Sequence, residues 1–189
     1  MKMLRNKKAL STVITTLIIL VVSVLLATVV TFYAINVTTT RVQEESLQIT
    51  KMHVWCTNEG DASAAFMITN TGGRDTVIDK ITVRGKESDL GNVYYWKVNE
   101  TDGDTVPSDL DWVDDAPNLN TTYEDEHAEF FSASSLDALT LRSGARMVIY
   151  IYNLDHLSTS DIGISIGVVV FTANAQYHKE ANVEAVIPS

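Results

Sequence analysis

The chain has very few cysteines, and long stretches of it lack charge of one sign or of both. Cys56 is its one cysteine among 189 residues, which excludes an intramolecular disulfide framework and a cysteine-rich zinc site. Residues 10–35 contain no charged side chain, and residues 99–129 contain eleven acidic residues but no Lys or Arg. With 14 Lys and Arg against 24 Asp and Glu, the net charge of −10 argues against a nucleic-acid-binding protein, which needs a basic surface.

The uncharged stretch, residues 10–35, predicts a long apolar helix. Its length exceeds both the roughly 20 residues that span a bilayer and the apolar core of about 7–15 residues of a secretory signal peptide. Four basic residues precede it: Lys2, Arg5, Lys7 and Lys8. The positive-inside rule therefore places the N-terminus in the cytoplasm and everything after Asn36 outside.

Three interpretations of this helix compete. It is a signal peptide that is removed, a plain single-pass anchor, or a segment that stays in the mature protein as the core of a polymer after cleavage before Leu10. Small and hydroxylated residues favour the third, because they repeat with spacings of 4, 7, 4 and 7 and fall within about 60° of one another around the helix. This stripe, which would let helix backbones approach closely, consists of Thr12, Thr16, Ser23, Ala27 and Ala34.

Residues 7–14 (KKALSTVI) resemble the class III signal peptide of archaeal type IV pilins and archaellins. The resemblance implies that a prepilin peptidase cuts between Ala9 and Leu10, with Lys7 and Lys8 as its basic recognition element. Residues 1–9 are then a leader whose removal takes four positive charges and leaves a mature net charge of −14.

Two positions depart from related patterns. Thr12 stands where many archaeal pilins have proline, so this part of the match is partial. Ile14 stands where bacterial type IV pilins carry glutamate, a departure that fits the archaeal branch. The resemblance implies a helical filament of identical subunits at the archaeal cell surface, built by assembly machinery from a precursor in the plasma membrane.

Residues 47–189 predict an extracellular head made of strands, joined to the helix by a junction that ends near residue 46. Seven short apolar or alternating runs are separated by turn signals, with no helical pattern between them. These runs are residues 47–56, 65–69, 76–83, 93–97, 147–152, 162–168 and 181–187. The chain is therefore predicted to be α+β, with a long hydrophobic helix followed by an antiparallel β-sandwich.

The Gly-rich turn at residues 70–75 predicts that the runs on either side of it, residues 65–69 and 76–83, pair as a hairpin. This segment resembles a hairpin that recurs in the heads of archaeal pilins and archaellins, where β-sandwiches decorate a filament core of helices.

The acid-rich segment, residues 99–129, predicts an elaborated surface loop that keeps a filament surface hydrated. Its carboxylates are also oxygen ligands of the kind that Ca²⁺ prefers. The candidate ligands are Asp102, Asp104, Asp109 and Asp111, but the EF-hand spacing is absent.

Three Asn-x-Thr sequons predict N-glycosylation outside the membrane, and the filament resemblance strengthens that expectation. Asn99 and Asn120 lie in loop sequence, whereas Asn36 lies beside the apolar helix and is less accessible.

No pattern predicts an enzyme or a cofactor. Residues 163–167 match G-x-S-x-G, but Ser165 lies inside an alternating apolar run instead of a strand-turn-helix. The four histidines lack metal-ligand spacing. The sequence therefore predicts a structural subunit that polymerises through its N-terminal helix for adhesion, and two alternatives stay open: an archaellin of a motility filament, or a monomeric membrane-anchored binding module.

Overall fold

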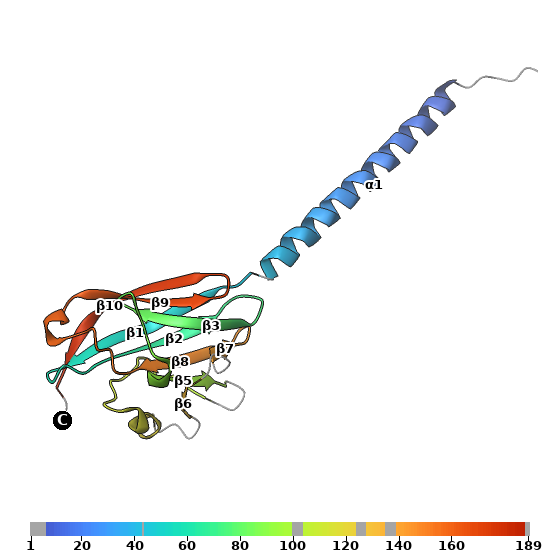
Figure 1. Cartoon of the computed structure of the whole chain (residues 1–189). Coiled ribbons are helices and arrows are strands. Elements are labelled where there is room, and N and C mark those ends of the chain that lie inside the picture. The colour runs from blue at the N-terminus through green and yellow to red at the C-terminus, as the bar shows by residue number, and fades with distance from the viewer. Residues whose placement is uncertain (1–6, 43, 100–103, 124–127, 135–138, 188–189) are drawn as a thin grey trace, which may run out of the picture. The chain divides into compact units, whose positions relative to one another are not determined.

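The computed structural model describes residues 7–42, 44–99, 104–123, 128–134 and 139–187. Contacts along the chain divide it into two compact units, a helix unit in residues 1–43 and a head in residues 44–189 (Figure 1).

The first unit is one helix, α1 (Lys7–Val42), which confirms the predicted long apolar helix. Its 36 residues include no glycine and no proline, so nothing interrupts the ladder of backbone hydrogen bonds. Within it, residues 11–39 (Ser11–Thr39) are long and apolar enough to cross a membrane.

The head is a curled and mostly antiparallel sheet. Ten strands belong to it in the described part of the chain: β1 (Leu47–Thr57), β2 (Ala62–Asn70), β3 (Thr76–Val83), β4 (Lys86–Glu87), β5 (Val93–Val98), β6 (Phe131–Ser132), β7 (Thr140–Leu141), β8 (Arg146–Ile151), β9 (Ser165–Thr172) and β10 (Gln176–Val186). The order is β4-β3-β9-β10-β1-β2-β8-β5-β6, and β7 pairs with β3. The contact between β1 and β10 is parallel, and the other pairs are antiparallel.

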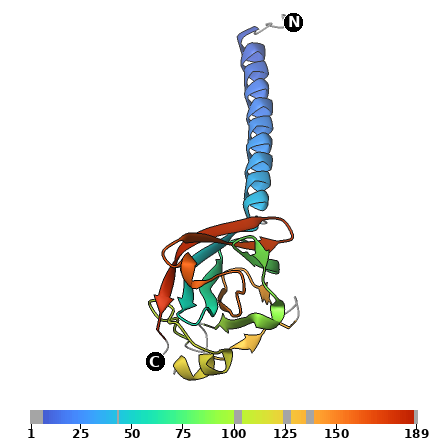
Figure 2. The same cartoon turned by 60° about the vertical axis from the view of Figure 1, so that its left-hand side comes forward.

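Strand β10 joins the two halves of this sheet. Its residues 176–182 pair with β9, and its residues 183–186 pair with β1 (Figure 2). The halves enclose one apolar core, in which Phe66 and Ile149 of one half and Ile81 and Val168 of the other are at most 1% exposed. The fold is therefore α+β as predicted, and the curled sheet is compatible with the predicted sandwich.

The predicted hairpin between β2 and β3 is wrong. Strand β2 pairs with β1 and β8, whereas β3 pairs with β4, β7 and β9. The turn between them crosses from one half of the sheet to the other. The N–H groups of Thr71 and Gly72 donate to the carbonyl oxygen of Ser46 at 2.9 and 3.1 Å, which holds the turn beside the start of β1. A Cβ on Gly72 would lie 2.6 Å from the Glu44 carbonyl oxygen. Glycine is therefore needed at this position because the backbone of Glu44 comes so close, and not because the turn closes a hairpin.

The acid-rich segment packs on the outer face of the sheet, which the sequence analysis missed. Its apolar side chains form a second core with the sheet aromatics Trp55, Trp96 and Tyr150. The buried residues that it contributes are Leu110, Val113, Leu119 and Tyr123, and Phe130, directly after the segment, belongs to the same core. Asp104 is buried, but the other described acidic side chains are exposed, so the segment is both a hydrated surface and a packed layer. The exposed ones are Asp109, Asp111, Asp114, Asp115 and Glu129.

Candidate functional sites: an apolar helix and an acidic cavity

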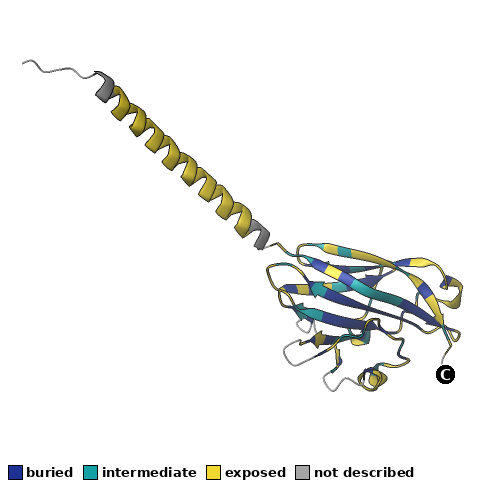
Figure 3. Ribbon diagram, turned by 180° about the vertical axis from the view of Figure 1, so that it is seen from behind, coloured by how far each residue is buried: buried dark blue, intermediate teal, exposed yellow. Residues whose placement is uncertain are grey.

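The surface of α1 is apolar on every side. Its large apolar side chains between Val13 and Val37 are 39–71% exposed, as the yellow helix in Figure 3 shows. A helix that is apolar all round is stable only where lipid or other apolar helices surround it. This unit is therefore suited to an apolar environment and not to water.

Seven hydroxyl groups of α1 bond within the helix itself. Thr15, Ser23 and Thr28 donate to backbone carbonyl oxygens three or four residues earlier, at 2.8–2.9 Å. Hydroxyls that bond in this way leave no unsatisfied donor when the helix enters an apolar medium. The many Thr and Ser residues are therefore compatible with burial in lipid or among helices.

Two of the predicted stripe residues belong to a small-residue face that the structure extends. Thr31 donates to the carbonyl oxygen of Ala27 at 2.7 Å, and Thr38 donates to that of Ala34 at 2.8 Å. Ala27 and Thr31 line one shallow groove and Ala34 and Thr38 line another. We call these four residues the small face. They repeat at the spacings 4, 3 and 4, and the predicted stripe included Ala27 and Ala34 but not Thr31 and Thr38.

The rest of the predicted stripe lies nearer the N-terminal end of α1. Thr16 donates to the carbonyl oxygens of Thr12 and Val13 at 3.1 and 2.9 Å, and Ser23 to that of Leu20 at 2.9 Å. All of these side chains are exposed.

The predicted cleavage residues lie at the start of α1. The helix begins at Lys7, so Lys7, Lys8, Ala9 and Leu10 form its first turn. The remainder of the predicted leader, residues 1–6, lies outside the described residues.

The three sequon asparagines are exposed. Asn36 lies in α1, and Asn99 follows β5 directly. Asn120 lies in α2 (Leu119–Thr122), where its side-chain oxygen accepts a hydrogen bond from the N–H of Phe130 at 2.8 Å. The amide nitrogen, the atom that a glycan would join, takes no part in that bond.

The Ca²⁺ candidates are not gathered at one point. Asp104 is buried and accepts a hydrogen bond from the N–H of Asn99 at 2.7 Å, Asp109 binds a histidine, and Asp102 lies outside the described residues. Asp111 is exposed, and its backbone N–H donates to the Tyr123 hydroxyl at 3.2 Å. Within the described ranges, no three Asp, Glu, His or Cys side chains are close enough to hold one metal ion.

His53 links β1 to the acid-rich segment and to β10. A β-bulge precedes it, where Lys51 has a φ of 49°. Its ring nitrogens lie 2.7 Å from Asp109 Oδ1 and 2.9 Å from Glu184 Oε1, and the ring stacks on Trp55 with centroids 5.3 Å apart. We call His53, Asp109 and Glu184 the histidine clasp.

Protonation strengthens the histidine clasp, because only the imidazolium ring donates from both nitrogens. Burial lowers the pKa of His53, but the hydrogen bonds and negative charges of Asp109 and Glu184 outweigh burial and raise it above its usual value. The same hydrogen bond from His53 lowers the pKa of Asp109.

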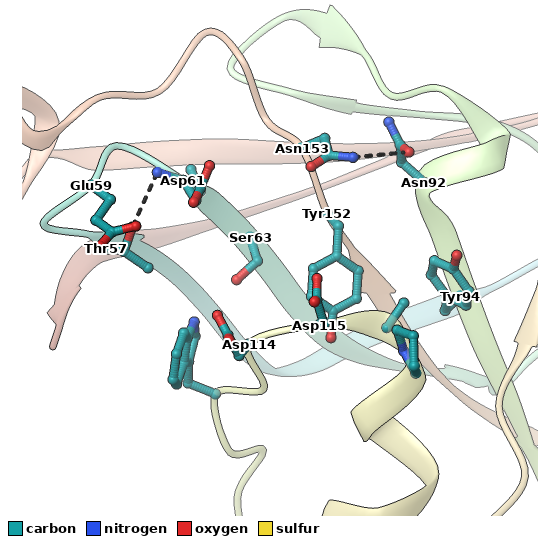
Figure 4. Close-up of a pocket in the computed structure, with 14 residues that line it drawn as sticks. Thr57, Glu59, Asp61, Ser63, Asn92, Tyr94, Asp114, Asp115, Tyr152 and Asn153 are labelled. Atoms are coloured by element: carbon teal, nitrogen blue, oxygen red, sulfur yellow. Dashed lines mark hydrogen bonds between the residues drawn. The ribbon is translucent and has the colours of Figure 1, made fainter. Parts of the chain in front are cut away.

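A cavity of about 480 Å³ opens beside the acid-rich segment (Figure 4). Three parts of the chain supply its polar walls: Glu59 and Asp61 from the turn after β1, Asp114 and Asp115 from the acid-rich segment, and Tyr152 from the end of β8. The Asp61 N–H donates to Thr57 Oγ1 at 3.1 Å, and Asn153 Nδ2 donates to Asn92 Oδ1 at 3.2 Å. These bonds fix two rims of the cavity.

Tyr152 is the most buried aromatic ring of the cavity wall, at 9% exposure. Its ring packs edge-on against Tyr94 with centroids 5.9 Å apart, and the hydroxyl has no hydrogen-bond partner among the described residues. Burial, followed by the negative charge of Asp115, raises its pKa, so the phenol stays neutral and keeps its proton.

Sequence reasoning missed both the clasp and the cavity. Their residues are far apart in the chain, and no local motif connects them. Comparison with known proteins adds no assignment: no protein-family model matches the chain, and no curated protein matches it.

Proposed function

We propose that the protein is the structural subunit of a type IV pilus-like filament at the archaeal cell surface, and that α1 is the element through which identical subunits polymerise for adhesion. The observation that carries this proposal is the apolar surface of α1, which is exposed on all sides in the single chain. A surface of this extent requires lipid or other helices around it.

The length of α1 supports a role beyond anchoring. Its apolar part, Ser11–Thr39, has 29 residues and is therefore about 43 Å long at 1.5 Å per residue. The hydrocarbon core of a bilayer is about 30 Å thick. About 13 Å of apolar helix thus exceeds the membrane requirement, and a filament core would bury it.

The small face offers a place for close helix contact. Lipid tails are as apolar as leucine, so packing and not the hydrophobic effect drives helix association in a membrane. Small residues at Ala27 and Ala34, with threonine hydroxyls bonded inside the helix, allow backbones to approach without leaving unsatisfied donors.

Mass spectrometry of filaments sheared from the native cells tests the proposal. We expect a mature chain that starts at Leu10, together with filaments in negative-stain images. A Lys7→Gln, Lys8→Gln double variant should retain Met1 and yield no filaments, because the basic recognition element is lost. The matched control, Arg41→Gln, removes a positive charge at the other end of α1 and should be processed normally.

Two results contradict the proposal. A surface protein that keeps Met1 and forms no filament is a plain anchored protein, and a chain that starts after residue 36 has lost α1 as an ordinary signal peptide. The acidic cavity favours the anchored form as a second candidate, a membrane-anchored binding module, since a ligand pocket needs no polymer.

A further inference from the structure

The acidic cavity is rich in hydrogen-bond acceptors. Four carboxylates, from Glu59, Asp61, Asp114 and Asp115, face it, and the described residues that line it include no Lys, Arg or His. Carboxylates that share a small space repel one another unless a cation lies between them. The cavity is therefore electrostatically complementary to a positively charged ligand.

The Tyr152 hydroxyl is an independent sign of a ligand. Buried hydroxyls almost always have a hydrogen-bond partner, because leaving one unpaired costs free energy. This hydroxyl has none among the described residues although the side chain is 91% buried. Figure 4 shows the ring pointing from the end of β8 toward the part of the chain that carries Asp114 and Asp115. A ligand in the cavity could supply the missing partner.

The geometry favours an organic cation over a metal ion. A metal ion needs several oxygen ligands within about 2.5 Å of one point, and the described carboxylates form no such group of three. The cavity of about 480 Å³ is instead large enough for an organic group, and Tyr94, Trp112 and Tyr152 give it aromatic walls. Aromatic faces attract ammonium and guanidinium groups, and they also pack against an attached hydrocarbon chain.

We propose that this cavity binds an ammonium or guanidinium group carried on an aliphatic chain. Such a group donates several N–H bonds, which the carboxylates of Asp61, Asp114 and Asp115 can accept together with the Tyr152 hydroxyl oxygen. Two sources carry this chemistry: the lysine or arginine side chain of a second copy of this chain, and a free polyamine. The proposal is independent of polymerisation through α1.

Calorimetric titration of the full chain in detergent tests the proposal, with spermidine and N-acetyl-lysine methylamide as probes at 0.15 M salt. We expect saturable binding of one probe molecule per chain. An Asp114→Asn, Asp115→Asn variant should weaken it by at least about tenfold, the scale of one lost charge-assisted hydrogen bond. The matched control, Asp79→Asn with Glu87→Gln, removes two exposed carboxylates that do not line the cavity and should leave binding unchanged.

Tyr152→Phe removes only the unpaired hydroxyl. It should weaken binding about fivefold, as expected for one hydrogen bond, and its near-UV circular dichroism should match that of the wild type. Equal weakening in the cavity variant and in the control would mean diffuse attraction to an acidic surface, and would overturn the proposal. So would the absence of saturable binding, or calcium binding that displaces the probes at equal concentration.

Sedimentation velocity of the same samples separates the two sources. If spermidine dissociates complexes that the Asp114→Asn, Asp115→Asn variant cannot form, the natural ligand is a basic side chain of a second copy. If spermidine binds without changing the sedimentation coefficient, the ligand is a free amine. A failed filament assay with retained spermidine binding would overturn the proposed function alone.

Discussion

Ala27→Leu tests whether the small face of α1 is where subunits meet. The substitution adds three carbon atoms at a position that lines a shallow groove, and it makes the helix more apolar. Membrane insertion should therefore be preserved, while close approach of a second helix at this face should be blocked.

The magnitude follows from the cost of overpacking. Extra carbon atoms in a well-packed contact cost about 1–3 kcal/mol. Every subunit in a filament repeats the contact, so the subunit concentration that supports polymerisation should rise about 5- to 150-fold.

Filament yield after shearing, normalised to total subunit on immunoblots, is the appropriate assay. Ile18→Phe is the control, because it also adds three carbon atoms and lies nine residues from Ala27, which is 180° around the helix at 100° per residue. Ile18 is 58% exposed in the single chain. A normal yield with Ala27→Leu, or an equal loss with Ile18→Phe, would refute the assignment of the contact to the small face.

Three further predictions concern the head. Leu119 is fully buried in the acid-rich segment, so Leu119→Ala should lower the free energy of unfolding by about 2–5 kcal/mol. Denaturant titration of the full chain in detergent measures this change. If the segment were a solvated loop, the loss would be less than about 0.5 kcal/mol. Because the pKa of His53 is raised, the histidine clasp stabilises the head fully below pH 6.5 and loses this effect as the pH rises through the pKa of His53 in the folded state. His53→Gln should therefore flatten this part of the profile of melting temperature against pH. An unchanged slope would contradict the clasp. Cys56 is fully buried and its pKa is raised by burial, so a maleimide should label it only after unfolding, and rapid labelling of the native head would disprove this burial.

The sequence predicted the elements whose signal is local. The uncharged run of residues 10–35 predicted α1, since length and composition alone determine that assignment. Alternating or continuous apolar runs predicted β1, β3, β5 and β8 to within a residue or two at most ends. The start of β9 was predicted three residues early, because Ile162 and Ile164 continue the alternation although they precede the strand and are exposed.

Pairing partners could not be predicted in the same way. The turn at residues 70–75 carries the composition of a hairpin, but its backbone bonds to Ser46, which is 25 residues before Thr71. The packing of the acid-rich segment on the sheet could not be predicted for a related reason. Its carboxylates dominate the composition, whereas buried residues such as Leu119 and Tyr123 determine where it packs.

In the proposed polymer, the composition of α1 would provide little net driving force for its transfer out of lipid, and this gives the small face its importance. Each apolar side chain exchanges lipid for equally apolar protein when helices assemble. The hydroxyls of Thr31 and Thr38 bond to their own helix in either setting, so they add no penalty and no attraction. What remains to favour the polymer is close packing, which is strongest where side chains are smallest. A filament built on this helix should therefore be sensitive to added volume at Ala27 and Ala34, and tolerant of it on the opposite side.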